Sequence, residues 1–193
     1  RQKKKLLILL IHYHKKGSLV MFKNFFKFVG ENKSCRSIKD FINAVSGKSY
    51  LNGMYRFFEK NDIDEWNDIV GDCFPKYKDT FSVLSYDWMG RIFALEKKTN
   101  MVILFEPGTG DVYDTDADII KFHDELISQN PIECLVSDLF EYWYKANDYK
   151  PLAYKDCVSY KVPLFLGGKD ELDNLDICDM EVYWEILMPL INL

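Results

Sequence analysis

Residues 81–114 read FSVLSYDWMGRIFALEKKTNMVILFEPGTGDVYD. Three apolar runs at 81–86, 91–95 and 102–105 are separated by short turn segments at 88–90 and 97–100. A Pro-Gly-Thr-Gly turn at 107–110 then precedes a fourth short run. Apolar runs of this length, bounded by glycine and polar residues, are typical of consecutive antiparallel strands. We therefore predict a β-meander in the middle of the chain.

Helical patterns lie before the predicted meander. Residues 37–45 place Ile38, Phe41 and Val45 on one face, and Gly47 follows as a stop. A second pattern runs from about residue 63 to Cys73, with Asn61 as its predicted cap. Apolar residues three and four positions apart indicate amphipathic helices.

The segment after the meander is predicted to be helical with one extended stretch. Helices are expected at 119–129 and 135–146, and an extended segment at 158–166. A last helix is expected from Glu181 to about Leu187, capped by Asp179 and limited by Pro189. It is expected to pack inward through Val182, Ile186 and Leu187. The fold class that follows is α+β, an antiparallel sheet with helices packed beside it.

The chain has 193 residues, of which 48% are hydrophobic and 16% aromatic, enough to form one well-packed domain. Residues 1–20 contain a basic cluster and a six-residue apolar run, too short for a signal peptide or a membrane span. We interpret 1–20 as a non-native or disordered leader preceding Met21. Residues 21–193 are expected to form one domain, with a helical part at about 21–75 and the sheet and C-terminal helices at 76–193.

Charge is distributed unevenly along the chain. The formal charge is −5, and because residues 1–20 carry six bases and no acid, the rest carries −11. An acidic body repels phosphate backbones and attracts basic proteins. We therefore expect no direct binding to nucleic acid.

The five cysteines are widely spaced, at 35, 73, 134, 157 and 178, with no CxxC pair. This pattern indicates reduced thiols in a cytoplasmic protein, and neither a disulfide framework nor a zinc site. No metal or cofactor is predicted. The glycine-containing segments at 106–111 and 166–170 lack the spacing of a phosphate-binding loop and are interpreted as turns.

Few residues suggest catalysis. His123 is the one histidine beyond the first 20 residues, and no nucleophile motif accompanies it, so a structural surface or half-buried histidine is expected. No catalytic residue is predicted. The alternative is a small hydrolase or ligand-binding enzyme in which Asp87, His123 and C-terminal acids converge in one pocket.

The C-terminal acids are more informative. Residues 170–185 contain seven acids and no base, without the glycine of a calcium-binding loop. They can form a solvated edge, a docking surface for a basic partner, or, at Asp173 and Asp176, helix caps. The candidate partner-binding residues are Asp170, Glu171, Asp173, Asp176 and Asp179.

Several segments resemble a known family. They are YDWMGR at 86–91, FEPGTG at 105–110, YKVPLFLGGKD at 160–170 and DMEVYW at 179–184. In this order they are similar to the C-terminal domain of type VI secretion immunity proteins. Residues 50–56 and Trp66 resemble the upstream segment, described in longer members as GAD-like and shortened here. The motif residues, expected to be structural, are Tyr86, Asp87, Trp88, Gly90, Pro107, Gly108, Gly110, Lys161, Pro163, Gly167, Gly168, Tyr183 and Trp184.

The resemblance implies a cytoplasmic immunity protein that binds and occludes a cognate antibacterial toxin, typically a DNase. A nuclease is basic where it holds DNA, so an acidic inhibitor is physically suitable. Occlusion needs no catalytic residue in the inhibitor, and we predict no enzymatic activity. An orphan signalling adaptor is the remaining alternative.

Overall fold

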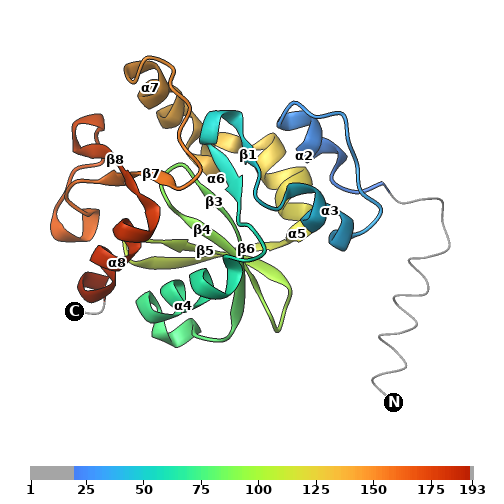
Figure 1. The fold of residues 1–193 in the computed structure, drawn as a ribbon, viewed down its shortest axis with the longest axis horizontal. Coiled ribbons are helices and arrows are strands. Elements are labelled where there is room, and N and C mark those ends of the chain that lie inside the picture. Colours follow the sequence, from blue (N-terminus) through green and yellow to red (C-terminus); the bar gives the residue numbers. More distant parts are fainter. Residues whose placement is uncertain (1–19, 192–193) are drawn as a thin grey trace.

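A computed structural model describes residues 20–191; the predicted leader therefore lies outside the described residues apart from Val20. The centre of the molecule is an antiparallel six-stranded sheet in the order β1-β2-β3-β4-β5-β6 (Figure 1). Its strands are β1 (Ser49–Tyr50), β2 (Tyr55–Phe57), β3 (Phe81–Asp87), β4 (Ile92–Glu96), β5 (Met101–Glu106) and β6 (Asp111–Asp118). The predicted meander, β3 to β6, is confirmed. Two short strands from the N-terminal part extend it.

Strands β2 to β5 are buried on both faces, which explains why they are mostly apolar, whereas the edge strand β6 is largely exposed and contains four aspartates. Side chains alternate along each strand, so Phe93 of β4 enters one core while Ile92 and Ala94 enter the other. In the same way, Val102 of β5 joins the first core and Ile103 joins the second. The α+β class is thereby confirmed as a sheet between two helical layers.

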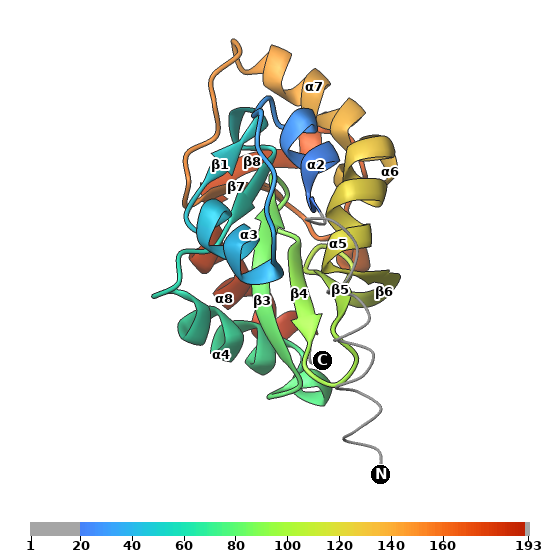
Figure 2. The same cartoon turned by 90° about the vertical axis from the view of Figure 1, so that its right-hand side faces the viewer.

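Helices from both ends of the chain cover the sheet. One core is covered by α2 (Lys23–Phe28), α3 (Ile38–Val45), α5 (Ile119–Lys121), a π-helical segment (Phe122–Ile127), α6 (Pro131–Leu135) and α7 (Ser137–Ala146). The other is covered by α4 (Ile63–Cys73) and α8 (Met180–Ile191). Figure 2 shows α4 and α8 together on one side of β3, away from α5 and α6.

A second, two-stranded sheet stands beside the first. It pairs β7 (Asp156–Tyr160) with β8 (Leu175–Asp179), and Cys157 faces Cys178 across the pair. The backbone N–H of Val158 donates to the carbonyl oxygen of Trp88 at 2.7 Å, which fixes this small sheet to the β3–β4 turn. Short 3₁₀ turns occur at Leu51–Gly53, Pro75–Tyr77, Leu164–Leu166 and Leu172–Asn174.

Several local predictions were wrong. The helix expected at 135–146 is broken at Val136, which adopts a left-handed conformation with φ 50° between α6 and α7. The extended segment at 158–166 ends at Tyr160, because residues 164–166 form a 3₁₀ turn.

Predicted helix ends also differ from those observed. Asp62, rather than Asn61, precedes α4, and its side chain makes no capping hydrogen bond. Pro189 lies inside α8, which continues to Ile191. By contrast, the Ser37 side chain caps α3, and Asp179 accepts a hydrogen bond from the N–H of Val182 at 3.1 Å, as predicted for the start of the last helix.

Candidate protein-docking surface

The five candidate partner-binding residues are all exposed, but they belong to two different elements. Asp170, Glu171 and Asp173 lie in the loop before β8, whereas Asp176 and Asp179 lie on the strand itself. The strand was not expected from sequence. Asp179 caps α8 and the Asp176 carboxylate accepts from the N–H of Ile177 at 2.9 Å, so these two carboxylates also serve the local fold.

The loop that carries the first three acids is held in shape by Asn174. Its side-chain amide receives a hydrogen bond from the N–H of Val162 and donates to the carbonyl oxygens of Val162 and Lys169. A Cβ added to Gly168 would lie 1.8 Å from the Val162 oxygen, so only glycine fits this close approach. The motif at 160–170 thus forms a compact platform rather than an extended strand.

Two tryptophans of the motifs connect the β3–β4 turn to helices, Trp88 to α6 and Trp184 to α8. Trp88 donates through its indole N–H to the carbonyl oxygen of Leu135, and Trp184 to that of Gly90, each at 2.9 Å. The ring of Tyr160 lies against Gly108, where an added Cβ would come within 2.9 Å of it. These contacts place the α8 and β7–β8 surface rigidly on the sheet.

Arg56, which sequence reasoning missed, fixes the segment that enters β7. Its side chain is completely buried and lies 4.6 Å from the ring centre of Tyr86. The guanidinium donates to the carbonyl oxygens of Ala153, Asp156 and Asp87. An arginine within an apolar strand could have been recognised in the sequence as a structural residue, because a buried charge requires several hydrogen-bond partners.

The helices α4 and α8 form an acidic groove of about 390 Å³. Its carboxylates come from both helices: Glu65, Asp68, Asp72, Glu181 and Glu185. Lys78 pairs with Asp72 at 2.6 Å, at an exposed position. The sequence had not predicted that the acids of α4 and the C-terminal acids share one surface. Glu65, Asp68 and Asp72 are spaced for one helical face, but only the tertiary fold brings that face beside α8.

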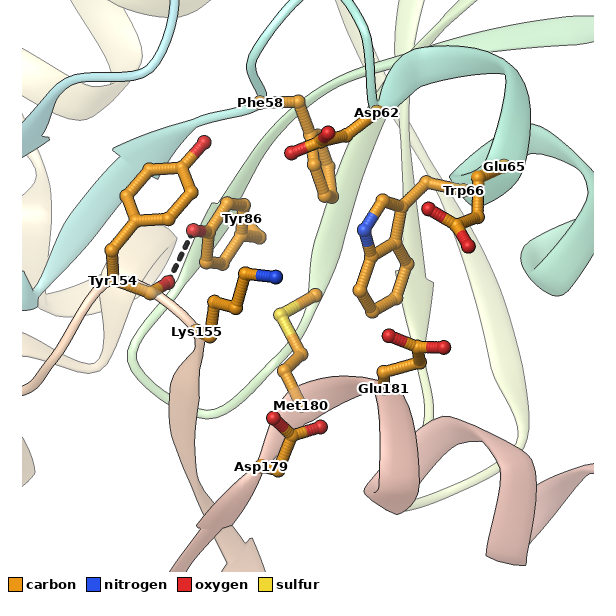
Figure 3. Close-up of a pocket in the computed structure, with 10 residues that line it drawn as sticks. All are labelled: Phe58, Asp62, Glu65, Trp66, Tyr86, Tyr154, Lys155, Asp179, Met180 and Glu181. Carbon is orange, nitrogen blue, oxygen red and sulfur yellow. Dashed lines mark hydrogen bonds between the residues drawn. The ribbon is translucent and has the colours of Figure 1, made fainter.

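An aromatic hollow continues this groove. Figure 3 shows the rings of Phe58, Trp66 and Tyr86 at its floor, with carboxylates around them. Four of the ten lining residues are acids, namely Asp62, Glu65, Asp179 and Glu181, and Lys155 is the one base. The hollow and the groove share Glu65 and Glu181, so they form one acidic surface with an aromatic end. We call this the α4–α8 acidic surface.

Asp87 and His123 do not form a common site with the C-terminal acids. Both are completely buried, whereas the acids are exposed. Asp87 binds the Nε of Arg91 at 2.7 Å and accepts from the backbone N–H of Met89. The hydrolase alternative needed these groups in one pocket, and the structure does not bring them together.

His123 is more deeply buried than predicted, because aromatic rings enclose it. Its ring contacts Phe25, Phe41 and Phe57, and its nitrogens bond to the Tyr55 hydroxyl at 3.0 Å and the Ile119 carbonyl at 2.7 Å. Burial lowers the pKa of His123 from 6.5 to about 4. It is therefore neutral at physiological pH and packs as a core residue.

Three further findings concern the described residues alone. The five cysteines form no disulfide with one another, and the Sγ atoms of Cys157 and Cys178 lie 3.6 Å apart. Between residues 20 and 191 no group of three or more histidine, cysteine and acidic side chains is arranged to hold a metal ion. Within that same range, no helix has the length and apolarity needed to span a membrane.

Residues 133–190 match the model of the family described as T6SS immunity protein Tdi1, C-terminal. The match confirms the resemblance for the segments at 160–170 and 179–184: residues 133–190 of this chain are similar to that C-terminal domain. The matched segment includes β7, β8 and α8. The GAD-like resemblance of residues 50–66 stays a prediction.

One solved structure shows the same fold. The crystal structure of Atu4351 from Agrobacterium tumefaciens is similar with a TM-score of 0.57 over 78% of this chain and 73% of that chain. At 15% sequence identity, this similarity concerns the fold alone. No curated protein sequence matches the chain.

Proposed function

We propose that this chain is a cytoplasmic, non-enzymatic immunity protein that binds a basic toxin of the nuclease type and blocks its nucleic-acid site. The α4–α8 acidic surface carries the proposal. It collects carboxylates from two helices, α4 and α8. A surface of one charge raises the rate of encounter with an oppositely charged partner and repels nucleic acid itself.

Nuclease inhibition by occlusion fits the arrangement of the site. A nuclease holds the phosphate backbone with lysine and arginine, and an acidic protein surface can occupy those side chains instead. The aromatic hollow adds apolar contact next to the carboxylates, and Trp66 and Tyr86 are of the residue types that contribute most to protein interfaces. The inhibitor needs no reactive group for this.

The experiment uses the purified products of the genes adjacent to this one, among which the toxin is sought. Purified toxin should degrade DNA, and the full-length chain should suppress this at an equimolar ratio while forming a complex by size-exclusion chromatography. A chain that leaves DNA degradation unchanged, although both proteins are folded, would overturn the nuclease proposal. Complex formation with a toxin of another activity would retain the immunity role and replace the toxin class.

A further inference from the structure

An apolar groove of about 630 Å³ lies along a different face of α8 from the acidic groove. Its walls are the 159–166 segment, β8 and α8. Several large apolar side chains in it are exposed to solvent: Ile186 by 59%, Leu166 by 52%, Val182 by 48%, and Val162 and Ile177 by 46% each. Single exposed apolar residues are ordinary, but a contiguous group on a folded surface marks an interaction site.

Helix α8 separates the two grooves because of its residue spacing. Val182 and Ile186 are four residues apart and share one face, while Glu181 and Glu185, shifted by one position, line the acidic groove. A shift of one residue turns a side chain by about 100° around a helix. Apolar and acidic strips therefore run side by side along α8, with its third face, including Trp184 and Leu187, buried in the core.

The rim of the apolar groove decides what can occupy it. Asp176 is the one acid in its lining, and the exposed acids of the 170–173 loop precede Asp176 by three to six residues. Lys161 is the one base in the lining, and its ammonium group donates to the carbonyl oxygen of Asp173 at 3.0 Å. An apolar segment flanked by lysine or arginine would bury its side chains in the groove and place its charges against the acidic rim.

We propose that this groove holds an apolar segment of the toxin, flanked by basic residues, and provides the contacts that keep the complex together. This inference rests on the proposed function, and it assigns different roles in toxin binding to the two strips of α8. The acidic strip accelerates association, while the apolar strip slows dissociation, since buried apolar anchors act mainly on the rate of dissociation.

The test replaces Val182 and Ile186 together by glutamine, which keeps the charge and the helix propensity. Ile132→Gln is the matched control, because Ile132 is equally exposed at 59% but lies on α6. Binding of catalytically inactivated toxin from the neighbouring gene is measured by surface plasmon resonance. We expect the double variant to dissociate about tenfold faster or more, with the control within twofold of the parent.

A second probe separates this inference from the proposed function. A synthetic amphipathic peptide with leucine on one face and lysine on the other should bind the parent chain and not the double variant. If the parent binds toxin and the double variant dissociates equally slowly, the groove inference fails while the immunity role stands. If the parent does not bind that toxin, the proposed function fails, and the groove inference is then tested by the peptide alone. A peptide that binds the parent and the double variant equally, or binds neither, overturns the groove inference. If the parent chain is a dimer and the double variant is a monomer, the groove serves self-association, and the inference of a toxin-binding groove is overturned.

Discussion

The indole N–H of Trp184 donates a 2.9 Å hydrogen bond to the carbonyl oxygen of Gly90. This bond joins α8 to the β3–β4 turn, 94 residues earlier in the chain. Trp184 is completely buried, and Gly90 has a φ of +73°. The surface of α8 is therefore oriented by a buried polar contact with the central sheet.

Trp184→Phe should lower the free energy of unfolding by about 1–3 kcal/mol, because the Gly90 carbonyl oxygen loses its partner in a buried site. Urea denaturation followed by circular dichroism measures the change. Tyr142→Phe, at a side chain 67% exposed, is the control and should stay within about 0.5 kcal/mol of the parent. A Trp184→Phe chain as stable as this control would show that the bond contributes nothing.

Gly90→Ala should also destabilise the fold, by about 1–3 kcal/mol. A Cβ at this position would lie 3.2 Å from Sγ and 3.3 Å from Cβ of Cys157, and the positive φ disfavours any side chain. Gly30→Ala separates the two effects, since Gly30 has a φ of +82° with no atom within 4 Å of the added Cβ. We expect the larger loss at Gly90. If Gly90→Ala and Gly30→Ala lower the free energy of unfolding equally, the loss comes from the backbone conformation alone and not from the contact with Cys157.

Strong local patterns made the centre of the fold predictable. The strands β3 to β5 have apolar runs ended by turn residues such as Gly90, and those signals are local. The strands β1 and β2 contain two and three residues, too few for a period to be visible. The break at Val136 was missed because valine rarely adopts positive φ, and tertiary packing must hold it there.

The candidate site was predictable only in part, because sequence patterns report local structure and not contacts between distant segments. The exposed acids at 170–179 are contiguous in sequence, so composition revealed them. The acids of α4 join them only through the packing of α4 against α8, and no local pattern reports a contact between helices more than 100 residues apart. The apolar strip of α8 resembles a core face in sequence, and Val182 and Ile186 were expected to pack inward. Exposure at both positions shows that expectation to be wrong.

Burial of His123 should make stability depend on pH. The unfolded side chain takes up a proton below about pH 6.5, whereas the folded one does so only near 4. Between these values the unfolded chain binds more protons, so the free energy of unfolding falls as the pH is lowered, by at most about 1.4 kcal/mol per pH unit for one proton. His123→Gln removes this titration while offering an amide to Tyr55 and Ile119. Denaturation between pH 7 and pH 4 should give a flatter profile for the variant, and parallel profiles would contradict a neutral buried imidazole.

Charge neutralisation tests whether the exposed acids of the 170–173 loop accelerate association with the toxin. Asp170, Glu171 and Asp173 are the targets, because Asp176 and Asp179 bond to backbone N–H groups and their loss would also affect stability. Asp170 accepts a hydrogen bond from the Tyr160 hydroxyl at 2.7 Å, and asparagine keeps an oxygen acceptor there. Replacing the three by asparagine or glutamine should slow association with the toxin several-fold at low salt, with little effect near 0.5 M salt, where exposed charges are screened. Association rates across a salt series, measured beside thermal unfolding, provide the readout.

The matched control removes the same number of charges elsewhere. Glu125, Glu133 and Glu141 are exposed on the helical layer across the sheet from α4 and α8, and their replacement by glutamine changes the net charge equally. If net charge alone steers the toxin, both triple variants will associate equally slowly. If position matters, only the 170–173 variant will lose the salt-dependent acceleration, because the field is strongest next to the surface that the toxin approaches. Parent-like association of a folded 170–173 variant would leave these acids as a solvated edge and limit steering to the α4–α8 acidic surface.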